Sequence, residues 1–294
     1  MKDEPSRTAE MVCLYRAAER RRPEPERALD DPFAKWFLGP LTRTALATLE
    51  ATGRLGRLAE DKTPTGLSTY IVARHRFIDD ALAKALAAGA EQVVLLGAGY
   101  DTRAYRFADQ LGERPVYELD FFATSRRKQQ IVQAHRDELP SVAVTAVEID
   151  FLRERIEDVL TGVGFALGRR TFFVWEGVSM YLTRDAVKAT LDTLRALGGP
   201  GSQVAMDFWF LLDSTDWLST LRRASASLLH LLGEPITFGI HPEDAPAFLE
   251  RQGFVVDDLA DPSELQRRYL TPDRSVYPAC FVLTASATSD PATS

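Results

Sequence analysis

Short apolar runs alternate along this chain with segments whose apolar residues recur at helical spacing. Segments of helical spacing separate the first five runs, and two further runs follow a long amphipathic stretch. Buried strands that alternate with helices predict an α/β fold with a mostly parallel sheet and helices on both faces. We expect the last strand to be antiparallel, because the linker before it is not a full-length helix. The predicted strands are 93–96, 116–119, 142–149, 172–175, 204–207, 254–259 and 279–284, and the predicted helices between the first five are about 102–111, 122–138, 152–161 and 184–197.

The first 90 residues are mostly helical in pattern. Ser6 or Thr8 is predicted to cap a first helix that ends at Glu19. Asp31 is the predicted cap of a second helix, which begins at the proline that follows it. A third helix is expected over 70–88 and leads into the first strand.

These elements predict one domain with additions over one edge of the sheet. The N-terminal helices and an insertion after the fifth strand are both expected to cover the carboxyl edge, where open α/β sheets bind ligands. Such a cover would exclude water from a bound ligand. We predict a single domain over 1–285, made of a helical cover (1–90), a cofactor-binding core (91–207), an inserted lid (208–240) and the last part of the sheet (241–285), followed by a flexible tail (286–294).

A glycine turn follows the first predicted strand. Gly97 and Gly99 let the backbone turn sharply and leave no side chain in the way of a ligand. Asp120 ends the second strand, 21 residues after Gly99, and Rossmann-type folds place a carboxylate on a ribose at about this spacing. For the glycines alone, a tight turn that binds nothing is the alternative. Together with Asp120 they predict a nucleoside cofactor across the ends of two parallel strands.

The residues of the turn indicate which cofactor it would bind. A pyrophosphate dinucleotide favours a third glycine, but Thr102 stands at that position. Asp101 would repel a pyrophosphate and would suit a ligand with a positive centre and no phosphate. S-adenosylmethionine is such a ligand, and we predict it as the cofactor. An NAD-dependent oxidoreductase is the second hypothesis, and a non-catalytic binding protein that keeps the fold is the third.

Three carboxylates, Asp120, Asp150 and Glu176, stand at the ends of successive strands. Asp120 would accept hydrogen bonds from the ribose hydroxyls. Asp150 would accept one from the adenine amine, with Phe151 against the base, and Glu176 would lie near the methionine end. Arg74 could form a bidentate pair with the cofactor carboxylate. The alternatives are helix caps for the three acids and a surface position for the arginine.

The composition is ordinary for a globular protein and narrows the range of partners. A net charge of −7 argues against a nucleic-acid partner. The two cysteines, Cys13 and Cys280, are far apart and indicate a reducing compartment rather than a disulfide framework. The four histidines show no metal-binding spacing. Because we find no secretory signal and no apolar run long enough to span a membrane, we predict a cytoplasmic protein with neither a metal nor a membrane partner.

Segments at both ends of the chain and around the glycine turn carry a family resemblance. They are Ser6-Arg-Thr-Ala9, Asp31-Pro-Phe33, Ala73-Arg-His-Arg-Phe-Ile-Asp-Asp80, Leu96-Gly-Ala-Gly-Tyr-Asp-Thr-Arg-Ala-Tyr-Arg106, Tyr117-Glu-Leu-Asp120, Asp150-Phe-Leu and Glu176-Gly-Val-Ser-Met-Tyr-Leu182. Over about residues 6 to 285 the chain resembles the leucine carboxyl methyltransferase family. More narrowly, it is similar to the bacterial branch of S-adenosylmethionine-dependent O-methyltransferases, some of which act on polyketides.

The resemblance implies a Rossmann-like class I methyltransferase fold and a set of cofactor contacts. Eukaryotic members have a lysine near the cofactor where this chain has Ser6, so a protein C-terminus is not implied as the substrate. The implied contacts are Arg74 to the methionine carboxylate, Gly97 to the cofactor by close backbone approach, Asp120 to the ribose, Asp150 with Phe151 to the adenine, and Glu176 to the amino group.

The same resemblance implies O-methylation of a small acceptor, which we expect to be aromatic or polyketide-like. A carboxylate acceptor is already ionised at neutral pH, whereas a phenol would be helped by a base. Tyr181, in the loop after the fourth strand, is predicted to line the acceptor pocket. His241 and Asp207 are possible bases, but no spacing singles them out, and we assign no catalytic base. An aromatic cluster after the fifth strand could form an apolar wall for the acceptor or pack under the lid; its members are Phe208, Trp209, Phe210 and Trp217.

Overall fold

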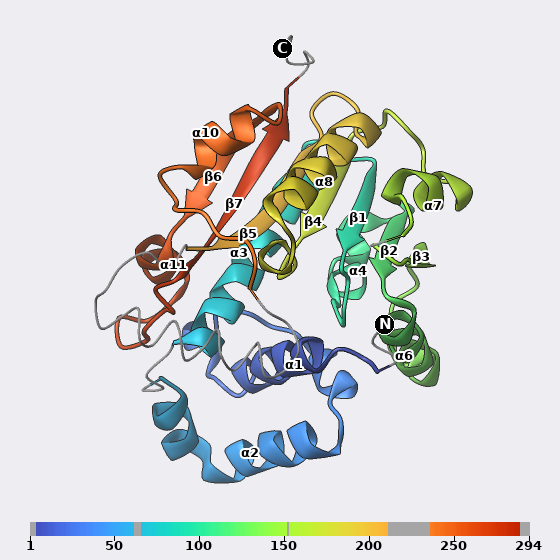
Figure 1. The fold of residues 1–294 in the computed structure, drawn as a ribbon. Helices are drawn as coiled ribbons and strands as arrows, with labels where there is room; N and C mark the ends of the chain where they lie inside the picture. Colours follow the sequence, from blue (N-terminus) through green and yellow to red (C-terminus); the bar gives the residue numbers. More distant parts are fainter. Residues whose placement is uncertain (1–3, 62–65, 152, 211–235, 289–294) are drawn as a thin grey trace.

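The chain folds around one seven-stranded sheet (Figure 1). The computed structural model describes residues 4–61, 66–151, 153–210 and 236–288, except the side chains of 52–61. The strand order is β3-β2-β1-β4-β5-β7-β6; β7 is antiparallel to both of its neighbours, and the other neighbours are parallel. The predicted α/β fold, the mostly parallel sheet and the antiparallel last strand are therefore confirmed. The strands are β1 (Gln92–Leu96), β2 (Val116–Asp120), β3 (Val144–Glu148), β4 (Thr171–Trp175), β5 (Gln203–Trp209), β6 (Phe254–Ala260) and β7 (Cys280–Ala287).

The predicted helices are present with shifted ends. The predicted helix 102–111 is two short helices, because the backbone at Phe107 departs from helical geometry between them. The α-helices of the described part are α1 (Arg7–Glu19), α2 (Pro40–Asp61), α3 (Leu67–Ala87), α4 (Arg103–Arg106), α5 (Ala108–Leu111), α6 (Phe122–Ala134), α7 (Ile156–Gly162), α8 (Arg184–Leu197), α10 (Ala245–Glu250) and α11 (Pro262–Tyr269). Short 3-10 turns are η1 (Glu24–Glu26), η2 (Ala34–Phe37), η3 (Arg136–Glu138) and η4 (Ser179–Tyr181).

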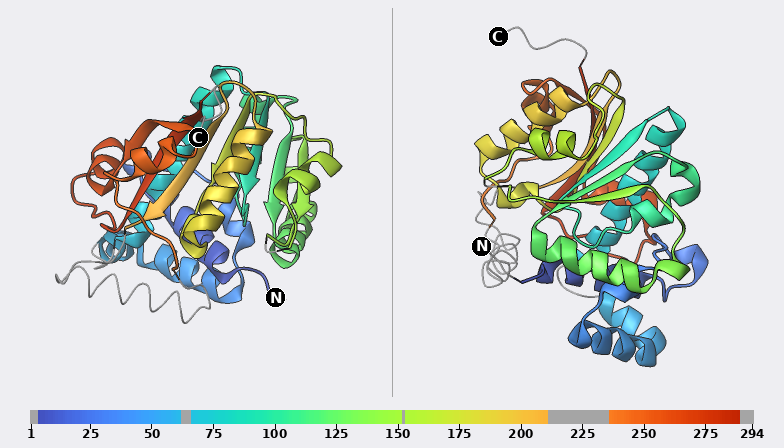
Figure 2. Two further views of the ribbon diagram at one scale, coloured as in Figure 1. Left: turned by 45° about the horizontal axis from the view of Figure 1, so that its top comes forward. Right: turned by 90° about the vertical axis from the view of Figure 1, so that its right-hand side faces the viewer.

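The two faces of the sheet form separate apolar cores, because successive residues of a strand point to opposite sides. Val93 and Leu95 of β1 pack in the core that includes α3, whereas Val94 and Leu96 pack in the core that includes α7, α8 and α10. Figure 2 shows the helices on either side of the sheet. All five residues of β1 are buried, as expected for a central parallel strand that has no face toward water.

The N-terminal helices lie over the carboxyl edge of the parallel strands. α1 crosses the ends toward which β1 to β5 run, and α2 packs against α1 on the side away from the sheet (Figure 1). Ser6 caps α1 as predicted: its Oγ accepts a hydrogen bond from the backbone N–H of Ala9 at 3.1 Å. α1 also ends at Glu19, as predicted.

Asp31 caps the next turn, but the long helix predicted there does not form. Its carboxylate accepts hydrogen bonds from the backbone N–H groups of Phe33 and Ala34, each at 3.0 Å. The turn that follows is the four-residue η2, because Pro40 disfavours helical backbone just before it and starts α2 instead. Trp36 of η2 stacks on His135 beyond α6, with ring centroids 4.2 Å apart, so this turn fastens the N-terminal segment to the body of the fold.

Two predicted boundaries differ from the structure. β5 reaches Trp209, so the first two residues of the predicted 208–240 insertion belong to the sheet, and residues 211–235 lie outside the described part. β7 continues to Ala287, which corrects the predicted start of the tail. Ser286 pairs with Gln203 of β5, and its hydroxyl donates to the carboxylate of Asp257 at 2.7 Å. Small polar residues are held in a strand here because β7 has a partner strand on both sides.

Candidate functional site

The glycine turn after β1 meets the acid at the end of β2, as the spacing predicts. Gly97 and Gly99 have φ values of 65° and 48°, in the left-handed region that favours glycine. The carboxylate of Asp120 accepts hydrogen bonds from the backbone N–H of Gly99 and, at 2.7 Å, from that of Phe121. Burial raises the pKa of Asp120 to about 6, although both hydrogen bonds favour its ionised form.

A side chain at Gly97 is excluded by the loop after β4. A Cβ atom there would lie 2.5 Å from Cγ2 of Val178, well inside van der Waals contact. The turn and the β4 loop are therefore in direct contact across the carboxyl edge. This contact places the two strand ends that flank β1 within reach of one small ligand.

The predicted adenine residues lie at the end of β3, beside the end of β2. Phe151 packs edge-on against Phe121, with ring centroids 5.7 Å apart. The backbone N–H of Asp150 donates to Glu154 at 2.7 Å, and its side chain lies 3.6 Å from the guanidinium of Arg153. The two rings and the carboxylate form one aromatic and polar corner next to Asp120.

The predicted methionine-end residues, Arg74 and Glu176, contact one another directly. Nε of Arg74 donates to Oε1 of Glu176 at 2.7 Å, and its Nη1 donates to Asp207 at 2.7 Å. Burial alone would raise the pKa of Glu176, but a hydrogen bond from His75 and the guanidinium groups of Arg103 and Arg74 hold it well below its ordinary value. The surface position considered for Arg74 is thus wrong: the side chain is buried beneath the carboxyl edge.

His75 adds a neutral donor to this cluster. Its Nδ1 lies 2.8 Å from Oε1 of Glu176 and 2.9 Å from the carbonyl oxygen of Ile71. Both neighbours are acceptors, so Nδ1 carries the proton. Burial lowers the pKa of His75 despite the attraction of Glu176, which keeps the imidazole neutral at pH 7.

Arg103 joins the two halves of the site, and the sequence reasoning did not single it out. Its guanidinium donates to Asp79 of α3, to Asp101 of the glycine turn and to Glu176 after β4, at 2.7, 2.5 and 2.7 Å. Asp101 therefore directs its carboxylate at this arginine. Burial opposes ionisation of Asp101, yet Arg103 and Lys128 bring its pKa down to about 2. The signal that could have identified Arg103 is its place in the Asp101-Thr-Arg run, two residues after the acid of the glycine turn.

The N-terminal cover is bonded to the same turn through buried side chains. Arg16 of α1 donates to the carbonyl oxygen of Tyr100 and to the carboxylate of Asp31, both at 2.7 Å. The hydroxyl of Thr102 donates to Asp31 at 2.7 Å. Thr102 is thus occupied with the cover, at the position where a dinucleotide fold needs glycine, which argues against the NAD hypothesis.

The buried ion pairs of the carboxyl edge form one connected network. Its side chains are at most 11% exposed. One negative charge is in excess, because five carboxylates face four guanidinium groups. The members are Asp31, Asp79, Asp101, Glu176 and Asp207 with Arg16, Arg74, Arg103 and Arg106.

The residues predicted to contact the methyl acceptor, Tyr181 and the aromatic cluster after the fifth strand, do not lie on one surface. Tyr181 lies in η4 after β4 and packs, half-buried, against the apolar core on the α3 side. Phe208 and Trp209 are buried on opposite faces of β5, because successive residues of a strand point to opposite sides, so these two cannot belong to one apolar wall. Phe210 packs against the ring of Phe281, and Trp217 lies outside the described residues.

Of the two possible bases, Asp207 is committed to other partners. It is fully buried, accepts from Arg74, and also accepts from the backbone N–H of Gly177 at 2.6 Å. His241 packs its ring near that of Phe210, with centroids 5.9 Å apart. Neither residue gains a catalytic role from its surroundings.

Other features of the described part bear on the remaining predictions. Cys13 and Cys280 are both buried, and neither is part of a disulfide. Within 4–61, 66–151, 153–210 and 236–288, no cluster of His, Cys, Asp and Glu is arranged to hold a metal ion. None of the helices described there is long and apolar enough to cross a membrane. Two cavities lie away from the strand-end residues: one between α1, α2 and α3, and a shallow one at the opposite edge of the sheet, around Glu91 and Arg169.

The sequence matches the family model for leucine carboxyl methyltransferase over residues 9–195. A protein of Parafrankia sp., provisionally named an S-adenosyl-L-methionine-dependent methyltransferase, is 34% identical over 202 residues, which cover 68% of this chain and 62% of that one. A Mycolicibacterium paratuberculosis protein with the same provisional name is 31% identical over 274 residues, covering 88% and 82% of the two chains. The match to the Parafrankia protein thus spans less than two thirds of its length.

A solved structure shares the fold at low sequence identity. It is a DUF574 family protein from Streptomyces avermitilis, with a TM-score of 0.58 and 14% identity over 93% of this chain and 96% of that one. The strand order and this likeness confirm the predicted Rossmann-like class I fold.

Proposed function

Because the chain belongs to the leucine carboxyl methyltransferase family, we propose that it transfers a methyl group from S-adenosylmethionine to an oxygen atom of a small molecule. The observation that carries the proposal is the contact between the glycine turn and Asp120 at the ends of β1 and β2. A backbone without side chains lies there beside a half-buried carboxylate, which is the arrangement a nucleoside ribose needs. The cofactor would supply an activated methyl group on a sulfonium.

The adenosine half of the cofactor fits the residues present. Asp120 would accept hydrogen bonds from the ribose hydroxyls while Gly97 and Gly99 allow close approach of the backbone. Asp150 would accept from the adenine amine, and Phe151 would lie against the base. The raised pKa of Asp120 supports this assignment, because a buried carboxylate gains most from new donors.

The methionine half requires a change of partners. Arg74 would pair with the methionine carboxylate and Glu176 with the ammonium, but the structure shows them paired with each other. The excess negative charge of the surrounding network favours a ligand with one net positive charge, and the cofactor has one. We propose that Arg74 and Glu176 each give up part of their mutual contact to the two charged ends of the amino acid.

The chain's own contribution to methyl transfer would be alignment and exclusion of water. α1 covers the carboxyl edge and is held to the turn through Arg16, so the site is shielded on that side. Displacement at a sulfonium consumes positive charge, and a dry, preorganised site lowers its barrier. Asp207, one of the two possible bases, is engaged by Arg74 and by the backbone of Gly177, which favours an acceptor that is already ionised or easily ionised, such as a carboxylic acid or an acidic phenol.

Two measurements test the proposal. Titration calorimetry with S-adenosylhomocysteine is expected to show binding at one site per chain. A screen with radiolabelled S-adenosylmethionine against aromatic carboxylic acids, phenols and peptide C-termini is expected to label one of the first two classes. Absence of any heat or thermal shift with S-adenosylhomocysteine would favour a binding protein that keeps only the fold.

A further inference from the structure

We propose that Lys128 of α6, held in place by Glu118 of β2, is a positioning residue for the cofactor, because its ammonium stabilises the Asp120 carboxylate that binds the ribose. This inference rests on the proposed function. Nζ of Lys128 lies 2.8 Å from Oε2 of Glu118, and each of the two side chains is 5% exposed. Apart from this ion pair, no described residue accepts a hydrogen bond from Nζ, and none donates one to Oε1 of Glu118.

The strand and the helix after it bring Lys128 to the end of β2. Glu118 precedes Asp120 by two residues, so both side chains lie on the same face of the sheet. α6 begins at Phe122, and Lys128 lies six residues further on, about 9 Å along the helix axis. Because the side chains of an α-helix tilt toward its N-terminus, the lysine points back toward the end of β2. The ion pair with Glu118 then holds the ammonium on the face of the strand that also carries Asp120.

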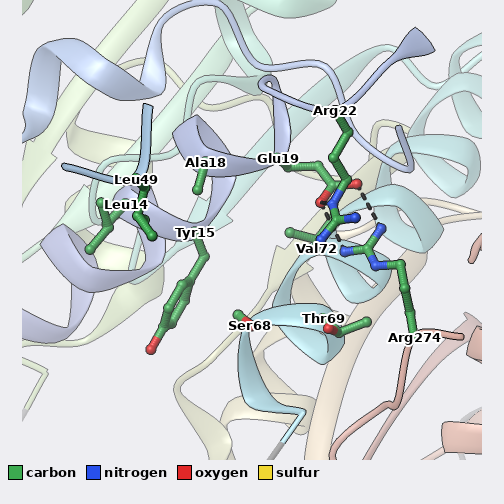
Figure 3. Close-up of a pocket in the computed structure, with 10 residues that line it drawn as sticks. All are labelled: Leu14, Tyr15, Ala18, Glu19, Arg22, Leu49, Ser68, Thr69, Val72 and Arg274. Atoms are coloured by element: carbon green, nitrogen blue, oxygen red, sulfur yellow. Dashed lines mark hydrogen bonds and ion pairs between the residues drawn. The ribbon is translucent and has the colours of Figure 1, made fainter. Parts of the chain in front are cut away.

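The N-terminal cover closes this corner from water. The backbone N–H of Ser6 donates to Oγ1 of Thr124 in α6 at 3.2 Å, and the thiol of Cys13 in α1 donates to the carbonyl oxygen of Tyr100 at 3.8 Å. The cavity between α1, α2 and α3 (Figure 3) lies apart from this corner, because its lining includes neither Cys13 nor Lys128. Charges that are kept from water interact more strongly than exposed ones, so the buried ammonium acts on the carboxylates around it.

Lys128 is the charged group with the largest effect on Asp120. Burial raises the pKa of Asp120 to about 6, whereas the hydrogen bonds from the backbone of Gly99 and Phe121 and then the charge of Lys128 act against this rise. Glu118 opposes Lys128, but its effect on Asp120 is smaller. The titratable and charged groups around the pair and Asp120 are Asp101 and Tyr100 in the glycine turn, Tyr105 on α4, Cys13 on α1 and Arg127 on α6.

Stability alone does not account for a lysine at this position. A buried ion pair contributes little net stability, because the desolvation of its two charges offsets their attraction. Two apolar side chains of similar volume would fill the same space. What the ammonium adds is an electrostatic preference for ionised Asp120, which is the form that accepts both ribose hydroxyls.

Titration calorimetry with S-adenosylhomocysteine between pH 5 and pH 8 tests the proposal on the parent and three variants. Lys128→Met removes the ammonium and keeps a long side chain. Glu118→Gln/Lys128→Met removes both charges, so that no acid is left buried without a partner. Arg126→Met is the matched control, since it removes a cation of the same helix that is 66% exposed and pairs with Glu148.

The expected signature is a change in the pH profile of binding. Parent affinity is expected to fall as the pH decreases through about 6, where Asp120 takes up its proton. In both Lys128 variants we expect this midpoint roughly half to one pH unit higher, so that affinity drops about two- to fivefold at pH 6 and hardly at pH 8. Arg126→Met is expected to match the parent. An unchanged midpoint, or a loss of the same size at every pH, would overturn the proposal, because a merely structural role does not depend on the protonation of Asp120. If Lys128→Met does not fold, the double variant decides.

A readout without ligand separates this inference from the proposed function. Thermal unfolding at pH 7.5 is compared for Asp120→Asn in the parent and in Glu118→Gln/Lys128→Met. Without the ammonium the ionised carboxylate is less stable, so the gain in Tm from Asp120→Asn is expected to be larger in the double variant by about 2 °C or more. Equal gains in the two backgrounds would overturn the inference even where the parent binds S-adenosylhomocysteine. If the parent does not bind it, the proposed function fails, and the melting temperatures still decide the role of Lys128.

Discussion

Replacing Asp120 with asparagine is expected to make the ligand-free protein more stable while it weakens cofactor binding. Burial raises the pKa of this carboxyl group from 3.8 to about 6. A rise of that size means that the ionised carboxylate costs the folded state roughly 3 kcal/mol at pH 7. Asparagine removes the charge, but its amide oxygen accepts weaker hydrogen bonds than a carboxylate does from the backbone N–H groups of Gly99 and Phe121. We therefore expect a net gain of about 1–2 kcal/mol, or about 2–8 °C in melting temperature.

The pH dependence follows from the same raised pKa. Between pH 3.8 and 6 the folded parent binds a proton that the unfolded chain does not, so its stability penalty is full above pH 6 and fades as the pH falls. The advantage of Asp120→Asn is thus expected at pH 7.5 and largely gone at pH 5. Thermal unfolding of both proteins at the two pH values measures this.

Although Asp120→Asn is expected to stabilise the ligand-free protein, it is expected to weaken cofactor binding. The ionised carboxylate is the form that accepts both ribose hydroxyls, so Asp120→Asn is expected to weaken S-adenosylhomocysteine about a hundredfold at pH 7.5. Parent affinity is expected to fall about tenfold from pH 7 to pH 5 as the group takes up its proton. Glu148→Gln, at the paired position of the neighbouring strand, is the control, since its carboxylate is exposed and pairs with Arg126. Equal affinity in parent and Asp120→Asn would refute the ribose role, and a lower melting temperature of the variant at pH 7.5 would refute the buried-charge argument.

Three further outcomes follow from the structure. Arg103→Leu leaves the carboxylates it joins buried without their shared partner, and we expect a loss of about 3–5 kcal/mol in urea unfolding; an unchanged midpoint would show that the network is dispensable. Burial raises the pKa of Cys13 to about 11, so the native thiol is expected to resist iodoacetamide at pH 8 and to react once urea unfolds the chain; fast native labelling would contradict this. Gly97→Ala combines a φ of 65° with a Cβ 2.5 Å from Val178, and we expect at least about 1–2 kcal/mol of destabilisation, partly restored by Val178→Ala; no restoration would place the cost in the backbone alone.

The sheet and its binding edge could be predicted because both are local in sequence. Each parallel strand is an apolar run, and Asp120 and Glu176 stand directly after their runs, so their place at one edge follows from strand direction. The partner of Glu176 could not be predicted in the same way. Arg103 is 73 residues away in the chain, and its neighbour Arg106 has the same character in sequence. Which arginine reaches which acid depends on how α3, the glycine turn and β4 pack against one another. The local pattern of apolar and polar residues does not determine this packing.

The length of η2 and the end of β7 escaped prediction for a similar reason. Ser286 looks like tail sequence, and only the two strands beside it hold it in the sheet. Phe208 and Trp209 look alike in sequence, yet the alternation of β5 sends them to different cores. In each case the deciding factor is a neighbour from elsewhere in the chain.

The ion pair between Glu19 and Arg274 bridges 255 positions of the sequence. A ribosome must release nearly the whole polypeptide before this contact can form, and until then the buried Glu19 has Arg22 as a partner but lacks Arg274. The contacts of the first helix are therefore completed late in biogenesis, after those that Arg16 makes with Asp31 and Tyr100 can already form. Shortening the chain from its C-terminal side past Arg274 would strand that acid and loosen the opposite end of the molecule.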